Sequence, residues 1–266
     1  MTKEKAIKIQ SKKHLQNNMP AAVGAALTVL LAFMTVYYFS ATIYSIIISI
    51  VINVNESLLD SYGLLFVGIM FLLIAGGIIL TLPLLTGLVR YCYILSKKSV
   101  CDYAQVFYYI TKARYLKTLK VNLGIFARNF FPAVISFLPA AITLLAAVSN
   151  SALKDNLAFE DFLWYYIGYA LLFAGIVVFY LLTKHRFLAL YYYIEDENLS
   201  ATQACNLSRA ATMGLSQNVT KLILSLLPAM LWCIIIIPCI FVIPYVLVAQ
   251  ATSAKWMIAL YNKDEN

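Results

Sequence analysis

Long apolar stretches occupy most of this chain and limit what it can fold into. A helix needs about 20 mostly apolar residues to cross a bilayer core of about 30 Å. Stretches of this kind predict six membrane spans, at about 21–51, 62–89, 130–148, 162–182, 222–237 and 245–260. The last two spans come from one apolar stretch, which we expect to turn between Pro238 and Pro244 because proline disrupts a helix interior. The sequence therefore predicts an all-α polytopic protein whose residues 1–266 form a single integral membrane domain.

The composition excludes a soluble protein. Hydrophobic residues make up 62% of the 266 residues and charged residues only 12%, whereas a soluble domain is about half apolar and about a quarter charged. So few charges could not cover a water-facing surface, and most of the surface must face lipid. The net charge of +8 follows the sides of the membrane instead of forming one basic patch, so we expect no nucleic-acid partner.

The basic residues predict the orientation, because lysine and arginine concentrate in cytoplasmic connections. With a cytoplasmic N-terminus, all but one of the 20 Lys and Arg residues lie on the cytoplasmic side, the exception being Lys154. We therefore expect both termini in the cytoplasm. We also expect segment 1–20 to belong to an uncleaved anchor, because the apolar run behind it is far longer than the roughly 7–15 residues of a signal peptide.

Two cytoplasmic connections are long enough to hold short amphipathic helices. In the first, Asp102 and Gln105 have the spacing of a capping box, and the helix that follows would carry one apolar stripe (Tyr103, Phe107, Ile110, Tyr115) and one set of cations (Lys112, Arg114, Lys117, Lys120). Such a helix could lie in the headgroup layer, where each cation attracts anionic lipid by about 1 kcal/mol. The alternative is a helix that packs under the bundle.

The second connection follows the same plan. Ser200 and Gln203 form a capping box, residues 201–213 can be helical, and Gly214 is a natural C-terminal stop. Leu-Leu-Thr also precedes an arginine twice, at 84–86 and at 181–183. This echo suggests a duplicated unit of span, cytoplasmic helix and span, as found in transport folds.

Scattered residues along the chain resemble a known family. They are Glu4-Lys5-Ala6, Leu15-Gln16-Asn17-Asn18, Asp196, Ala204, Ser208-Arg209, Met213-Gly214, Trp232, Pro244-Tyr245 and Tyr261. With them the chain resembles a bacterial membrane family, common in Firmicutes, that is catalogued as domain of unknown function 975. The family usually has a lysine shortly after Met-Gly, where this chain has Leu215-Ser216-Gln217-Asn218. The resemblance implies a six-span protein of the bacterial cytoplasmic membrane, with no assigned activity.

No sequence pattern indicates catalysis. Phosphate-loop, zinc-protease and nucleophile-elbow motifs are missing, and no Asp or Glu falls inside a predicted span. The two histidines, His14 and His185, lie in separate segments, and the five cysteines are scattered, which makes a metal site or a disulfide framework improbable. We therefore expect no catalytic residue, no metal and no cofactor.

The strongest candidates for ligand contact are cations at span ends. Arg128, followed by Asn129 and Pro132, lies just inside the third span, where an ionisable group indicates function by default. The cluster Lys184-His185-Arg186 ends the fourth span. Both could bind a lipid phosphate. The alternatives without a ligand are that Arg128 snorkels to the membrane interface and that the 184–186 cluster is only a stop-transfer flank. For Ser208 and Arg209 we expect bracing between cytoplasmic segments.

Other small and aromatic residues need no ligand. Small residues on the first two spans favour close helix packing, within the chain or between copies. They are Gly68, Gly76, Gly77 and Gly87 on the second span and Ser40, Ser45 and Ser49 on the first. Tyrosines at 91, 93 and 191–193 fit an interfacial aromatic belt.

These observations favour a scaffold or accessory subunit that binds anionic phospholipid or a protein partner on its cytoplasmic face. The alternative is a transporter or exporter component for a small or lipidic substrate, suggested by the echo and by the Pro-interrupted terminal hairpin.

Overall fold

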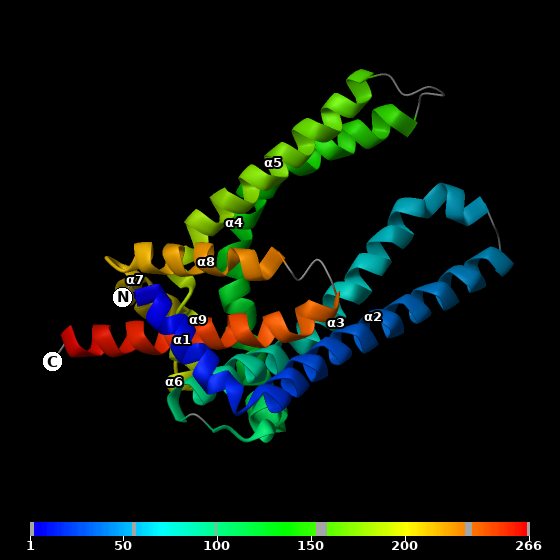
Figure 1. The fold of residues 1–266 in the computed structure, drawn as a ribbon. Coiled ribbons are helices and arrows are strands. Elements are labelled where there is room, and N and C mark those ends of the chain that lie inside the picture. The colour runs from blue at the N-terminus through cyan, green and yellow to red at the C-terminus, as the bar shows by residue number, and fades with distance from the viewer. Residues whose placement is uncertain (1–2, 55–56, 99, 153–158, 232–235, 265–266) are drawn as a thin grey trace. The chain divides into compact units, whose positions relative to one another are not determined.

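The computed structural model describes residues 3–54, 57–98, 100–152, 159–231 and 236–264 (Figure 1). These residues form helices and contain no strand, which confirms the predicted all-α class. In chain order the elements are α1 (Lys3–Gln16), α2 (Met19–Val54), α3 (Ser57–Lys98), the 3₁₀ helix η1 (Tyr103–Ile110), α4 (Lys112–Ala152), α5 (Phe159–Thr183), the 3₁₀ turn η2 (Lys184–Arg186), α6 (Ala189–Glu195), α7 (Ala201–Thr212), α8 (Ser216–Leu231) and α9 (Ile236–Asp264).

Five stretches of the described chain are long and apolar enough to cross a membrane. They are Met19–Ile52, Leu65–Lys98, Ala113–Ser149, Phe162–Glu195 and Ile240–Lys263. The protein is therefore a multi-pass membrane protein. The predicted span at about 222–237 is not among them, because α8 has 16 residues and reaches only about 24 Å at 1.5 Å per residue; residues 232–235 lie outside the described part.

The chain divides into two compact units. Unit 1 comprises Met1–Leu123 and Lys221–Asn266, and unit 2 comprises Gly124–Thr220. The boundaries fall inside α4 and α8. Unit 1 is thus built from both ends of the sequence, whereas unit 2 is one continuous segment.

Unit 1 contains the antiparallel helical pair α2 and α3, drawn in blue and cyan in Figure 1. The two helices approach closely at Gly77, where a Cβ atom would lie 2.1 Å from Val36 Cγ1. Near this point Ser40 Oγ donates a hydrogen bond of 3.3 Å to the Leu73 carbonyl. The predicted small-residue packing is therefore confirmed for Gly77 and Ser40, but Gly68 and Gly76 have open space beside them.

Helix α9 is the buried centre of unit 1. Its small residues Ala249, Ala251 and Ala254 are fully buried, and it packs on α1, α2 and α3. The predicted turn between Pro238 and Pro244 is wrong, because α9 runs through both residues. Pro238 is the third residue of α9, where a backbone N–H has no partner within the helix. Pro244 lies further inside, where a proline costs one backbone hydrogen bond without ending the helix.

Unit 2 contains the helical pair formed by α5 and the second part of α4, followed by η2, α6 and α7. Gly175 on α5 faces the backbone of α4, and a Cβ atom there would lie 2.4 Å from the Ser136 carbonyl oxygen. Side chains on both helices are widely exposed, including Phe131 and Phe173. Exposed aromatic surface of this kind suits contact with lipid.

The tyrosines predicted to form an interfacial belt are buried instead. Tyr91 and Tyr93 on α3 are at most 2% exposed. Tyr191, Tyr192 and Tyr193 are buried on α6. Their rings are part of the hydrophobic core. A tyrosine near the end of a span can be buried or can face the membrane interface, and the sequence alone does not distinguish the two.

The first predicted amphipathic helix differs from the structure. Asp102 caps the 3₁₀ helix η1 through a 3.1 Å bond from Ala104 N, but the Gln105 side chain accepts from Arg90 Nε and forms no capping box. Element η1 ends at Ile110, so the predicted cations lie on the long helix α4 and not on η1. The buried residues of η1 are Val106 and Tyr109, whereas Tyr103, Phe107 and Ile110 of the predicted apolar stripe are exposed. The fourth member of the stripe, Tyr115, is half-buried and lies on α4.

The helix predicted at 201–213 is confirmed as a helix, whereas its side of the membrane stays a prediction. Ser200 and Gln203 form a capping box at the start of α7, and the helix ends at Thr212. Gly214 has a φ of +83°, in the left-handed region that favours glycine after a helix end.

Candidate functional site

Two arginines of unit 2 lie side by side at the junction of α4 and η2. Arg186 Nη1 donates to the backbone carbonyl of Arg128 at 2.6 Å and to Asn129 Oδ1 at 2.7 Å. Arg128 Nη1 donates to the Gly124 carbonyl at 3.0 Å, and its Nη2 donates to Thr202 Oγ1 at 2.5 Å. We name Arg128 and Arg186 the arginine pair. The structure thus joins two cations that are 58 positions apart in the sequence.

Pro132 explains why Arg186 bonds to this carbonyl. In an α-helix the carbonyl of residue 128 would accept from the N–H of residue 132, but proline has no N–H. The Arg128 carbonyl is therefore left without its helical partner, and the Arg186 guanidinium supplies one. Replacing a freed backbone bond by a neighbouring side chain is how membrane helices tolerate proline.

Two further prolines have a similar arrangement in unit 1. Tyr115 Oη donates at 2.8 Å to the carbonyl of Leu80, three residues before Pro83. Lys8 Nζ donates at 2.5 Å to the carbonyl of Ser225, three residues before Pro228. Since a proline opens the helical turn that precedes it, carbonyls of that turn become available to donors from elsewhere.

The arginine pair is held by neutral groups. Within the part of the chain that the structure describes, neither guanidinium has a carboxylate at ion-pair distance, and their acceptors are backbone carbonyls, an amide and a hydroxyl. The positive charge of the pair acts on the buried thiol of Cys205 on α7. Burial raises the pKa of this thiol above its ordinary value, and the Arg128 and Arg186 guanidiniums partly offset this rise. The pair therefore carries two positive charges without a counter-ion in the described chain.

Helix α7 is positioned against this pair by polar contacts and by packing. The Ser200 cap fixes the first turn, which presents Thr202 to Arg128. Ala204 and Cys205 pack with Ala189 and Ile125. A Cβ atom at Gly124 would lie 2.5 Å from the Ala201 Cβ, so this close approach of α7 to α4 needs a glycine.

The remaining residues of the 184–186 cluster do not join the pair. The His185 carbonyl accepts from Ser208 Oγ at 2.8 Å and from Thr212 Oγ1 at 3.2 Å, and Leu188 N donates to Ser208 Oγ at 3.0 Å. Ser208 thus links α7 to η2. In the described part of the chain, the Lys184 and Arg209 side chains form no hydrogen bond with either arginine, and Arg209 is exposed.

The four cations predicted to form one set on the first connection have different surroundings in the structure. In unit 1 the ring of Tyr108 lies between two guanidiniums, with Arg90 Cζ 3.7 Å and Arg114 Cζ 4.1 Å from its centroid. Lys117 and Lys120 are exposed on α4, and the side chain of Lys112 lies outside the described part. Arg114 is therefore packed on an aromatic face, a role that a count of charges does not reveal.

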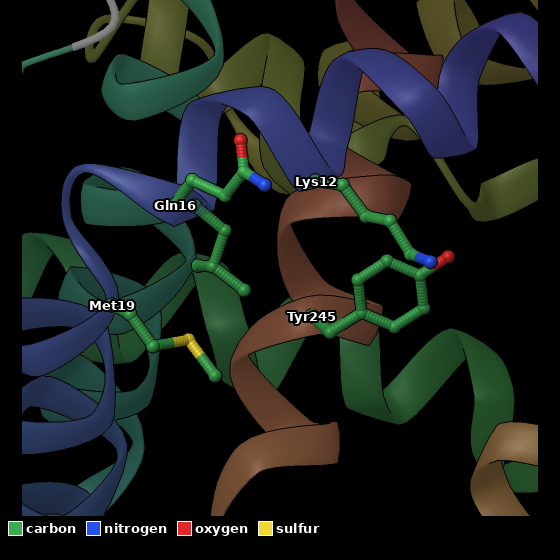
Figure 2. A pocket seen from close by; sticks show the side chains of 5 residues that line it. Lys12, Gln16, Met19 and Tyr245 are labelled. Atoms are coloured by element: carbon green, nitrogen blue, oxygen red, sulfur yellow. The ribbon is translucent and has the colours of Figure 1, made fainter.

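A cavity of about 420 Å³ lies between α1 and α9 in unit 1. We name it the α1–α9 cavity; it is lined by Lys12, Leu15, Gln16, Met19 and Tyr245. Figure 2 shows Lys12 and Gln16 on α1, Met19 at the start of α2 and Tyr245 on α9. Leu15, Gln16 and Tyr245 are among the residues of the family resemblance, and Pro244 beside them is buried.

Sequence reasoning missed Thr202 and Lys12. The Ser200 cap could have indicated Thr202, because it fixes which residues begin α7. Nothing in the sequence signals that α1 would pack along α9. In the described chain no group of three or more His, Cys, Asp or Glu residues could hold a metal ion.

Comparison with known proteins finds no matching family model, no matching curated protein and no matching solved structure. The resemblance noted above therefore stays a prediction.

Proposed function

We propose that this chain is a non-catalytic protein of the bacterial cytoplasmic membrane, with its N-terminus in the cytoplasm, that holds anionic phospholipid on its cytoplasmic face. Five crossings would place the C-terminus on the opposite side, unlike the two cytoplasmic termini expected from six spans. It would act as a scaffold or as an accessory subunit, alone or as a homo-oligomer. The observation that carries this proposal is the arginine pair, two adjacent guanidiniums whose acceptors are all neutral.

A lipid phosphate fits this pair chemically. Guanidinium groups present several N–H donors in a planar fork that matches phosphate oxygens. Arg128 uses both terminal nitrogens for neutral partners, and Arg186 uses only Nη1 in the bonds described. Donors of Arg186 therefore remain for an added anion.

The position in the chain favours a lipid over a soluble anion. Arg186 follows the end of α5 at Thr183, and Arg128 precedes the apolar part of α4. With a cytoplasmic N-terminus, both lie at the inner end of a span, where anionic headgroups attract nearby cations by about 1 kcal/mol each.

The transporter alternative loses one of its two supports. It used the terminal hairpin as a pair of proline-broken spans, but α9 continues through Pro238 and Pro244. The two Leu-Leu-Thr segments also differ in structure. Helix α3 continues from Thr86 to Lys98, whereas α5 ends at Thr183 and η2 follows.

The test is lipid retention. The full chain and the variants Arg128→Gln and Arg186→Gln are purified in mild detergent, exchanged into nanodiscs of phosphatidylcholine with a minor share of phosphatidylglycerol, and analysed by native mass spectrometry after release. We expect the native chain to retain phosphatidylglycerol above its bulk share and each variant to lose this enrichment severalfold.

The matched control is Lys221→Gln, which removes one exposed cation outside the arginine pair. Enrichment should survive in this control. Equal retention by all four proteins, or equal loss in the control, would overturn the proposal, since charge alone would then account for the binding.

A further inference from the structure

The α1–α9 cavity combines an apolar wall with a single cation. Leu15 is buried, and the Met19 thioether and the Tyr245 ring complete the apolar lining. Lys12 and Gln16 are exposed, and Figure 2 shows the Lys12 side chain extending toward the Tyr245 ring. The volume of the α1–α9 cavity, about 420 Å³, falls in the range of about 300–1,000 Å³ that ligand pockets occupy.

Three other side chains of α1, those of Lys3, Lys8 and Ser11, bind this helix to the rest of unit 1, and Lys12 takes no part in these contacts. Lys3 Nζ lies 4.8 Å from the Trp256 ring centroid, and Lys8 bonds the Ser225 carbonyl. Ser11 Oγ donates to Thr252 Oγ1 at 3.2 Å, and Ser11 is fully buried. Across the described residues, Lys12 has no carboxylate at ion-pair distance.

The cavity also lies beside the first residues of two stretches that are long and apolar enough to span a membrane. Met19 is the first residue of α2 and of the first apolar stretch that can span a bilayer. Tyr245 belongs to another such stretch, Ile240–Lys263. A molecule seated here would therefore have its apolar part at the edge of the bilayer core and its polar part beside the lysines of α1.

We infer that the α1–α9 cavity binds one acyl chain that carries an anionic head group. The head group lies on the Lys12 ammonium, and the chain lies against Leu15, Met19 and Tyr245. The volume suits a single chain, and the unpaired cation selects an anion over a neutral amphiphile of the same length. This site shares no residue with the arginine pair, so either proposal can fail without the other.

The test is photo-crosslinking on the full chain in phosphatidylcholine nanodiscs. The probe is a C16 fatty acid with a diazirine near the end of its chain, and peptide mapping locates the crosslinks. We expect them on residues 12–19 and near Tyr245. Oleate should displace the probe at a roughly two- to fivefold lower concentration than oleyl alcohol, the advantage expected of one exposed ion pair.

Two variants and one control make the test specific. Lys12→Gln should remove the advantage of oleate over oleyl alcohol, and Met19→Trp should lower crosslinking about tenfold for every chain by filling the cavity. Lys13→Gln removes a neighbouring exposed cation outside the lining and should change neither result.

The competitors also show whether the bound acyl chain belongs to a free fatty acid or to a membrane phospholipid. Stronger displacement by oleate than by oleoyl lysophosphatidylglycerol supports the site with a free fatty acid as ligand, and the reverse order supports it with a membrane phospholipid. Crosslinks elsewhere in the chain, equal effects of Lys12→Gln and Lys13→Gln, or equal potency of oleate and oleyl alcohol would each overturn the inference.

Discussion

The bond between Arg186 and the Arg128 carbonyl predicts a measurable coupling with Pro132. Arg186→Met removes the donors and keeps an apolar side chain of similar length. Two bonds are lost, of 2.6 Å and 2.7 Å. A hydrogen bond from a charged donor contributes about 1.5–3 kcal/mol, but both bonds are only part-buried and water can replace part of each. We therefore expect the free energy of unfolding to fall by about 1–2 kcal/mol.

The same substitution should cost less when the proline is absent. Pro132→Ala restores a backbone N–H at position 132, which can bond the Arg128 carbonyl within α4. In that background Arg186→Met loses mainly the bond to Asn129. We expect the two substitutions to be coupled by about 1 kcal/mol, which exceeds the roughly 0.3–0.5 kcal/mol scatter of independent sites.

The assay is unfolding by dodecyl sulfate in mixed micelles, followed by circular dichroism for the four proteins of the cycle. A second cycle with Arg209→Met in place of Arg186→Met is the control, because the Arg209 side chain is exposed and bonds no α4 carbonyl in the described structure. Additivity of Arg186→Met and Pro132→Ala within 0.5 kcal/mol would refute the assignment of Arg186 to the carbonyl freed by Pro132.

Three further outcomes are expected from single changes. Ser200→Ala should lower the stability of α7 by about 1 kcal/mol through loss of its cap, seen as faster amide exchange in the first turn and refuted by unchanged exchange. Gly87→Ala should destabilise unit 1, because a Cβ atom there would lie 1.9 Å from the Val106 carbonyl oxygen, whereas Gly76→Ala on the same helix meets open space and should not lower thermal stability. The pKa of His14 lies below its ordinary value because of burial and of nearby Lys255 and Lys13, so folding disfavours its charged form. Stability should be full above about pH 6.5 and fall as the pH drops further; His14→Gln should flatten this dependence in thermal melts from pH 7.5 to 5.5, and a native-like slope in the variant would contradict it.

The fold class and five of the six spans could be predicted because they depend on composition and run length. The sixth, at about 222–237, could not, because the prolines that suggested a hairpin lie inside α9. Helix α7 was also predictable, since Ser200, Gln203 and Gly214 are local signals that need no partner. The first amphipathic helix was not, because the break at Thr111 separates η1 from a basic segment that continues into α4. Hydropathy alone does not indicate where one helix stops and the next begins.

The arginine pair was predictable only as separate residues. Arg128 and Arg186 are conspicuous beside apolar stretches, but their bond depends on the carbonyl that Pro132 leaves free. The α1–α9 cavity depends on the docking of α1 along α9, a contact between the two ends of the chain. Long-range contacts of this kind follow from packing, which no local pattern encodes.

The division of unit 1 between the two ends of the sequence sets an order of assembly during synthesis. Helix α9 forms the centre of unit 1 but is made after the whole of Gly124–Thr220. About 100 residues separate the two parts, which takes roughly 5–20 s at a translation rate of 5–20 residues per second. Unit 2 can therefore be complete while α1, α2 and α3 still await their central helix. A stop codon before α9 would therefore leave α1, α2 and α3 without their central helix, whereas Gly124–Thr220 would keep all of its own residues.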